Sequence, residues 1–197
     1  VSLWTSLMTF FVSLLIWLNF DFQKKSFQFE EYSEWITNFG IVYHLGIDGI
    51  SLPFILLTTF LVPVCILCSW NAIKHRIKEF MISFLILETF VIGTFCSLDL
   101  IVFYIFFEAV LIPMFLIIGI WGGSNRVYAA FKFFLYTLFG SVLMLIAIIY
   151  ILNIVGSSDL TKILNYNFDE KIQIWLFLAF MISFAVKVPM WPFHTWL

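Results

Sequence analysis

The stretch LDLIVFYIFFEAVLIPMFLIIGIWGG, residues 98–123, decides the fold. It is almost wholly apolar over more than the ~20 residues that an α-helix needs to cross a bilayer. It lacks the polar and apolar alternation of a barrel strand, and every backbone polar group in hydrocarbon must be bonded internally. A single carboxylate, Glu108, lies near its middle. The stretch therefore predicts a transmembrane helix that contains a buried acid.

The composition of the whole chain has the same character. Of 197 residues, 63% are hydrophobic and 11% are charged, and the mean hydropathy is +1.07. The net charge of −2 offers no basic surface for nucleic acid. The three cysteines all lie in apolar runs, which argues against a secreted disulfide framework. The chain is expected to be a polytopic membrane protein with no nucleic-acid partner.

Six apolar segments are long enough to form membrane helices. A turn of about three residues separates the third segment from the fourth, which predicts a tight helical hairpin there. We expect one all-α membrane domain over residues 1–197, a transmembrane bundle with its last helix broken near Pro189. The six helices are expected near residues 2–19, 46–70, 79–97, 99–120, 127–154 and 171–197.

The charges of the connecting loops predict their sides. Loops 71–78 and 122–126 carry Lys, Arg and His, whereas loops 21–43 and 156–170 carry mostly Asp and Glu. By the positive-inside rule, the two basic loops face the matrix or cytoplasm. Val1 then lies on that same inner side.

Two charged residues fall inside predicted helices. Glu108 lies in the fourth and Lys187 in the sixth. Each costs roughly 2.5–3.5 kcal/mol at a helix centre on insertion scales, so each should face the bundle interior and meet a partner or water. If they pair, both stay charged; if the pair opens, burial disfavours both charged forms. The pair is either a site that takes and releases protons or a structural ion pair that joins two helices.

Prolines adjoin both charges. Pro189 and Pro192 cannot donate to the carbonyls of Ala185 and Val188, so unpaired oxygens are expected on both sides of Lys187. The helix should break there, as helices do where the backbone lines a polar cavity. Pro113 should distort the fourth helix more mildly, beside Glu108. Ordinary kinks are the alternative at both places.

Three further residues are weaker candidates for proton transfer. Lys132 could extend a path from Lys187 or direct its amine to the inner interface. Glu88 could act as a relay, pair with Lys132 or remain a neutral buried acid. His194 follows Lys187 by seven residues, and an imidazole can accept and release a proton near neutral pH, although a packing role is equally open.

Other polar residues have ordinary explanations. Asp48 and Asp99 precede apolar runs and are expected to cap helices. His44 and His75 lie in loops without neighbours at metal-binding spacing, so solvated histidines are expected. The sequence contains no G-x-G-x-x-G, P-loop, G-x-S-x-G or H-E-x-x-H motif, which leaves no visible cofactor or metal site.

Four stretches resemble a known family. They are GIDGISLPFILLTTFLVPVCIL, LDLIVFYIFFEAVLIPMFLIIGIWGG, AAFKFFLYTLFGSVLML and FAVKVPMWPFHTWL. Together they resemble the antiporter-like membrane subunits of proton-pumping NADH:ubiquinone oxidoreductase, respiratory complex I, and within that group the chain 4 (bacterial subunit M) type. The same group includes subunits of cation/proton antiporters.

The resemblance implies a role for each candidate. It implies inverted repeats, each with a helix broken at membrane depth, of which this chain holds one half. Glu108 would be the carboxylate that modulates the first half-channel and Lys187 its protonatable lysine. His194 would link this half to the centre, and Lys132 and Glu88 lie where some relatives carry a charge.

The resemblance also implies partners and a location. NAD, FMN, iron–sulfur clusters and ubiquinone would sit on other subunits, so this chain would carry proton transfer and not redox chemistry. Compared with the family, the chain lacks the first helix and the second half, so we expect a fragment or a split gene whose second chain completes the pump. Other membrane-arm subunits and lipids would be its neighbours. Its Phe-rich composition favours the mitochondrial inner membrane over a bacterial plasma membrane.

Three hypotheses follow from the sequence. The first is a proton-translocating pump subunit that responds to quinone reduction elsewhere in a complex. The second is a subunit of a cation/proton antiporter without a redox partner. The third is a structural remnant that only braces neighbouring helices.

Overall fold

The structure, a computed structural model, describes residues 1–24 and 26–197. Helices dominate it, and one two-stranded antiparallel sheet follows the first helix in the sequence. In chain order the elements are α1 (Ser2–Asn19), β1 (Gln28–Ile36), the 3-10 helix η1 (Thr37–Phe39), β2 (Ile41–Ile47), α2 (Ser51–Ser69), α3 (Ile77–Cys96), α4 (Leu100–Ala109), α5 (Leu111–Trp121), α6 (Arg126–Val155), α7 (Leu160–Ile163) and α8 (Glu170–Lys187).

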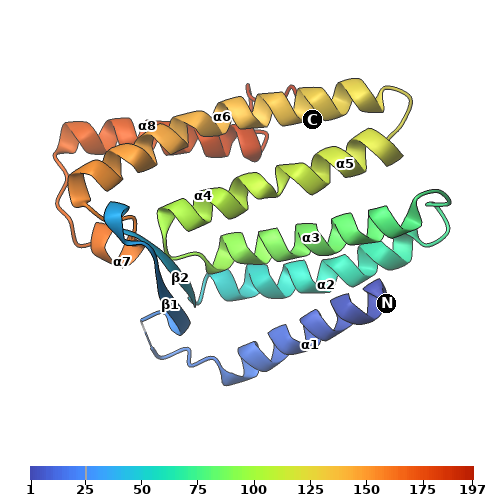
Figure 1. The fold of residues 1–197 in the computed structure, drawn as a ribbon, viewed down its shortest axis with the longest axis horizontal. Helices are drawn as coiled ribbons and strands as arrows, with labels where there is room; N and C mark the ends of the chain where they lie inside the picture. Colours follow the sequence, from blue (N-terminus) through green and yellow to red (C-terminus); the bar gives the residue numbers. More distant parts are fainter. Residues whose placement is uncertain (25) are drawn as a thin grey trace.

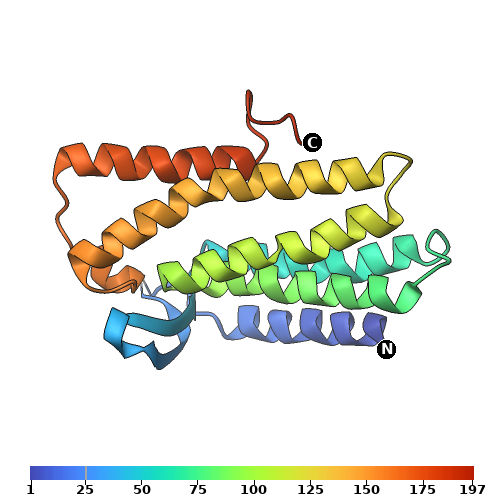
Figure 2. The same ribbon diagram turned by 45° about the horizontal axis from the view of Figure 1, so that its top comes forward.

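The long helices lie side by side as an antiparallel bundle (Figure 1). Helices α1, α2 and α3 form one side, α4 and α5 follow each other in line through the middle, and α6 and α8 form the other side (Figure 2). Small polar residues allow α1 and α2 to approach: the hydroxyls of Ser13 and Thr59 lie 2.8 Å apart and both residues are buried. The long helices predicted from the apolar runs are therefore present.

The acidic connection after the first helix, predicted at residues 21–43, contains β-structure that the prediction of an all-α chain did not include. Its residues form a hairpin in which β1 pairs antiparallel with β2. Strand β2 is mostly buried, whereas β1 is mostly exposed. Because β2 continues to Ile47, the next helix begins at Ser51 and not near residue 46. The strand was missed because it is short and runs directly into a much longer apolar segment.

Two of the predicted helices are interrupted. The segment expected at 99–120 is two helices, α4 and α5, which meet at Val110. The segment expected at 171–197 is helical only as far as Lys187, and residues 188–197 follow in turns without resuming a helix. Both interruptions lie close to a proline, as the sequence predicts. The first is one residue, Val110, whose backbone stays in the right-handed helical region, and the second is a helix end.

The connections separate by charge. The amino terminus and the loops after α2 and α5 lie at one end of the bundle, and the hairpin and α7 lie at the other (Figure 1). This matches the predicted grouping of the basic and acidic loops. Within the described residues, five stretches are long and apolar enough to cross a membrane, with α4 and α5 together counting as one. Helix α8, with three charged residues, is not among these five, in contrast to the six expected.

Candidate functional site

Glu108 and Lys187 meet inside the bundle. Glu108 is the penultimate residue of α4, and Lys187 is the last residue of α8. The ammonium Nζ lies 3.5 Å from Glu108 Oε1, and the two side chains are only 15% and 14% exposed. A largely buried amine and acid on separate helices thus face each other, as the sequence predicts.

The closest acceptor of the Lys187 ammonium is a backbone oxygen. Nζ donates to the carbonyl oxygen of Phe107 at 3.0 Å, and it lies 4.0 Å from the centroid of the Phe107 ring. The lysine therefore has three neighbours that favour positive charge: a carboxylate, a carbonyl dipole and the face of an aromatic ring. The second carboxylate oxygen of Glu108 is buried without a hydrogen-bond partner in the structure.

The break between α4 and α5 exposes the Phe107 carbonyl. In a continuous helix this oxygen would accept from the backbone N–H of Leu111. The i→i−4 bonds on either side remain, from Val110 N–H to the Phe106 oxygen and from Met114 N–H to the Val110 oxygen, but no bond from Leu111 N–H to the Phe107 oxygen is present among the described residues. Pro113 contributes to the distortion, since it has no N–H and its ring crowds the preceding turn.

The segment after Lys187 folds back on the end of α8. Met190 N–H donates to the Ala185 carbonyl at 2.9 Å, so the expectation that this oxygen is unpaired is wrong. The indole N–H of Trp196 donates to the Val186 carbonyl at 2.7 Å. The helix end is therefore closed by local bonds, because a turn and an indole can replace the donors that proline removes.

Within the described residues, no hydrogen bond or ion pair joins the weaker candidates to this pair. Glu88 is 3% exposed on α3, and its Oε1 has no hydrogen-bond partner in the structure. Lys132 lies half-buried on α6, and no ion pair joins it to Glu88 within the described part of the chain. His194 lies exposed in the turns that follow α8. The structure thus joins Glu108 to Lys187 and, among the residues it describes, shows no such contact for these three.

The helix caps follow the sequence prediction. Asp99 Oδ1 accepts from the backbone N–H groups of Ile101 and Val102 at the start of α4. Asp48 Oδ1 accepts from Ile50 and Ser51 at the start of α2. Asp99 does more than cap, because its other oxygen accepts from the Ser158 hydroxyl and from Val42 N–H at 3.3 Å.

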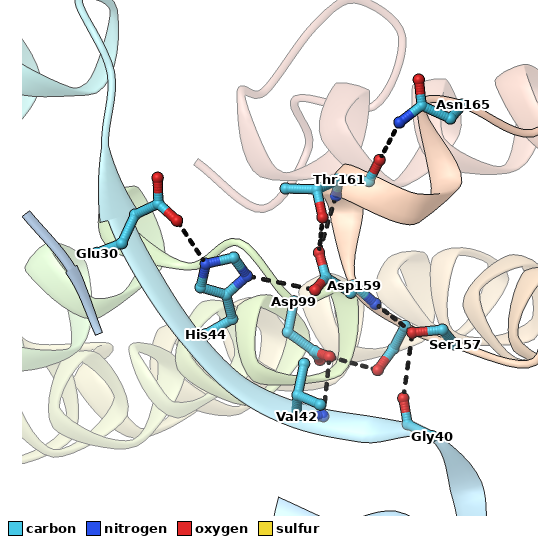
Figure 3. A network of polar contacts seen from close by, with 10 residues as sticks. Glu30, Gly40, Val42, His44, Asp99, Ser157, Asp159, Thr161 and Asn165 are labelled. Atoms are coloured by element: carbon cyan, nitrogen blue, oxygen red, sulfur yellow. Dashed lines mark hydrogen bonds and ion pairs between the residues drawn. The ribbon is translucent and has the colours of Figure 1, made fainter. Parts of the chain in front are cut away.

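His44 is the residue that the sequence prediction misplaced. It is 4% exposed on β2 and not solvated. Its Nε2 lies 3.3 Å from Glu30 Oε2, and its Nδ1 lies 3.4 Å from Asp159 Oδ2 (Figure 3). A carboxylate oxygen therefore lies near each ring nitrogen, although Nδ1 has no hydrogen-bond partner among the described residues.

Backbone contacts join the surroundings of His44 to the neighbouring connections between helices. Gly40 O accepts from Ser158 N–H and from the Ser157 hydroxyl (Figure 3). Gly40 approaches the end of α6 so closely that an added Cβ would lie 2.2 Å from the Gly156 oxygen. The hairpin, the α3–α4 turn and the α6–α7 connection are therefore joined into one cap at the acidic end of the bundle.

The described residues offer no metal site. Among residues 1–24 and 26–197, no group of three or more His, Cys, Asp or Glu side chains could hold a metal ion. The chemistry available at the paired site is proton exchange between an amine and a carboxylate.

Helices interrupted at membrane depth are a recurrent feature of secondary-transporter folds. The chain belongs to the NADH:quinone oxidoreductase/Mrp antiporter transmembrane family, whose model matches residues 97–197. A second family model, the amino terminus of NADH-ubiquinone oxidoreductase chain 4, matches residues 1–94.

Curated relatives agree with these matches. The chain is 52% identical over 198 residues to NADH-ubiquinone oxidoreductase chain 4 of Marchantia polymorpha. It is 50% identical over 210 residues to NADH-quinone oxidoreductase subunit M of Rhodobacter capsulatus. Both alignments cover 100% of this chain and 40% of the relative. The chain thus spans two fifths of the length of these relatives.

Two solved structures share the fold. A chain of respiratory complex I from Thermus thermophilus matches with a TM-score of 0.89 and 30% identity, over 100% of this chain and 41% of that one. A chain of the Mrp complex from Dietzia sp. DQ12-45-1b matches with a TM-score of 0.86 and 18% identity, over 98% of this chain and 21% of that one. The second likeness concerns the fold alone.

Proposed function

We propose that this chain is part of a proton-translocating membrane subunit of NADH:quinone oxidoreductase, and that it contributes one half-channel built on Glu108 and Lys187. The observation that carries the proposal is the 3.5 Å contact between the ammonium and the carboxylate, on side chains that are about 15% exposed. Burying such a pair seldom adds stability over apolar packing, so its presence favours a role beyond structure.

The proposed mechanism follows from this contact. With the carboxylate near, the Lys187 ammonium is stabilised and the lysine holds its proton. When the field from quinone reduction elsewhere in the complex draws Glu108 away, the low-dielectric surroundings disfavour the ammonium, and the lysine releases its proton. We place His194 next on the path, with Lys132 and Glu88 as further proton-transfer groups. This chain would move protons and carry no redox cofactor; NAD, FMN, iron–sulfur clusters and ubiquinone would sit on other subunits.

Partners and location follow from the same proposal. The neighbours would be other membrane-arm subunits, lipids and a chain that supplies the second half of the pump. The mitochondrial inner membrane is preferred, with the bacterial plasma membrane as the alternative. The basic end of the bundle would face the matrix.

Replacement of Lys187 tests the proposal. In the assembled complex, reconstituted in vesicles, we expect Lys187→Ala to lose most NADH-driven proton translocation while the complex still assembles. Glu108→Gln should reduce translocation too. Lys74→Ala is the control, because Lys74 is exposed in the loop after α2. Unchanged translocation by the Lys187 variant would reject the proposal.

A second candidate is a subunit of a cation/proton antiporter. The description of the matching family and the fold shared with the Mrp complex favour it as the alternative. Purification separates the two. A pump subunit should co-purify with flavin and iron–sulfur proteins, whereas an antiporter subunit should co-purify with small membrane proteins alone.

A further inference from the structure

We propose that Pro113 is a positioning residue, which keeps the Phe107 carbonyl available to the Lys187 ammonium. The inference rests on the proposed function, which it deepens by adding a second, neutral acceptor to the same site. It concerns the backbone at the α4–α5 break and not the acid–amine pair itself.

The distances rank the acceptors. Lys187 Nζ lies 3.0 Å from the Phe107 oxygen and 3.5 Å from Glu108 Oε1. The first distance is typical of a well-formed N–H···O bond, and the second lies beyond the usual range. The carbonyl is therefore the principal hydrogen-bond acceptor, while the carboxylate supplies charge from slightly farther away.

The carbonyl is available because the helical hydrogen-bond ladder is interrupted at Val110, where α4 passes into α5. Among the described backbone hydrogen bonds, none has the Phe107 oxygen as its acceptor. Pro113 is completely buried in the first turn of α5. It removes one backbone donor and crowds the Ala109 carbonyl, which favours an open turn at this point.

A proline alone does not end a helix in this chain. Pro63 lies inside α2, which continues without interruption. At the α4–α5 break, the ammonium takes the place of the missing N–H donor, so the open turn and the bound lysine stabilise each other. Helix breaks at membrane depth are tolerated where the freed groups are satisfied in this way.

The second acceptor has a consequence for proton transfer. A backbone carbonyl is not protonated at any pH at which the complex is active. It can therefore hold the amine against α4 in every charge state of Glu108. When the carboxylate moves or becomes neutral, the amine still has one acceptor. The Phe107 carbonyl therefore keeps Lys187 in place while Glu108 switches.

Restoring the helix tests this role. In the assembled complex in vesicles, Pro113→Ala should let Leu111 N–H bond to the Phe107 oxygen and take it from Lys187. We expect the alkaline limb of the pH profile of NADH-driven proton translocation to move about one pH unit lower, since a hydrogen bond to a charged group is lost. Pro63→Ala, the matched proline control, should leave the profile unchanged.

A ring control identifies the cause. Phe107→Leu removes the aromatic ring and keeps the main-chain carbonyl. We expect its pH profile to shift by much less than that of Pro113→Ala. A Pro113→Ala variant with an unshifted profile, or an equal shift in Phe107→Leu, would overturn the inference.

Two further variants keep the test decisive. If Pro113→Ala does not assemble, Pro113→Val replaces it, because it also restores the backbone N–H and fills more of the buried site. We expect the same shift of about one pH unit, and an unshifted profile overturns the inference. Lys187→Ala in the same assay separates the two proposals. If it pumps normally, the proposed function fails; if it does not pump and Pro113→Ala is unshifted, only the carbonyl ligand is rejected.

Discussion

Gly140 on α6 packs directly against Val186 on α8, the residue that precedes Lys187. A Cβ added to Gly140 would lie 2.7 Å from Val186 Cγ1 and 2.8 Å from Val186 Cβ. Helix α8 can approach α6 this closely only because residue 140 has no side chain. The position of Lys187 therefore depends on a glycine that lies on another helix.

Gly140→Ala should consequently destabilise the α6–α8 contact. Overpacking of this kind costs about 1–3 kcal/mol, and displacement of α8 would also move Lys187 away from Glu108. We expect a lower thermal unfolding temperature and weaker proton translocation in the purified complex. Gly119→Ala is the control, since its Cβ would meet Ala130 at an ordinary 3.5 Å. Equal unfolding temperatures and equal proton translocation for the two variants would contradict the proposed close packing of Gly140 against Val186.

His44→Ala should destabilise the cap at the acidic end of the bundle. The substitution removes a buried imidazole and leaves Oδ2 of the buried Asp159 without its polar neighbour, at a cost of about 1–3 kcal/mol. Thermal unfolding of the purified complex measures this loss. His75→Ala is the control, because His75 is exposed in a loop.

Glu30→Gln should have a much smaller effect than His44→Ala. The Glu30 side chain is 46% exposed, and pairs screened by solvent contribute about 1 kcal/mol or less. Thermal unfolding at low and high salt measures the difference. A loss for Glu30→Gln as large as that for His44→Ala would show that the outer carboxylate, and not Asp159, stabilises the histidine.

Asp99→Ala should cost more stability than Asp48→Ala, although both residues cap helices. Loss of an N-cap costs about 1 kcal/mol, which we expect for Asp48. Asp99 also bonds the Ser158 hydroxyl and Val42 N–H, so its removal leaves buried donors unpaired and should cost about 1–3 kcal/mol more. Thermal unfolding of the two variants compares them, and equal losses would mean that Asp99 acts as a cap alone.

Trp196→Phe should loosen the segment that follows α8. The phenyl ring can keep the contact with Phe133, whose centroid lies 5.1 Å from that of Trp196, but the bond to the Val186 carbonyl is lost. We expect a loss of about 1 kcal/mol and faster amide hydrogen exchange near the end of α8. Trp191→Phe is the control, because Trp191 is 84% exposed. Unchanged exchange in the Trp196 variant would show that the indole bond does not hold the helix end.

The long helices were predictable because hydrophobicity is a local property. The predicted segments 2–19 and 127–154 agree closely with α1 and α6, at Ser2–Asn19 and Arg126–Val155. Each can be predicted as a membrane helix from one stretch of chain, since the length and apolar content of that stretch are sufficient for the prediction. The hairpin was missed because its buried strand depends on contacts with the α3–α4 turn, such as Leu98 N–H to the His44 carbonyl.

The sequence by itself determined that this is a helical membrane protein with Glu108 and Lys187 inside its helices, because apolar length and an isolated charge within it can be recognised in a single stretch of chain. Only the tertiary structure decided that Lys187 binds the Phe107 carbonyl, 80 positions away in the chain, and that His44 is buried between two carboxylates. Those contacts depend on where helices break and how closely they pack, and such long-range geometry leaves no pattern in one stretch of sequence.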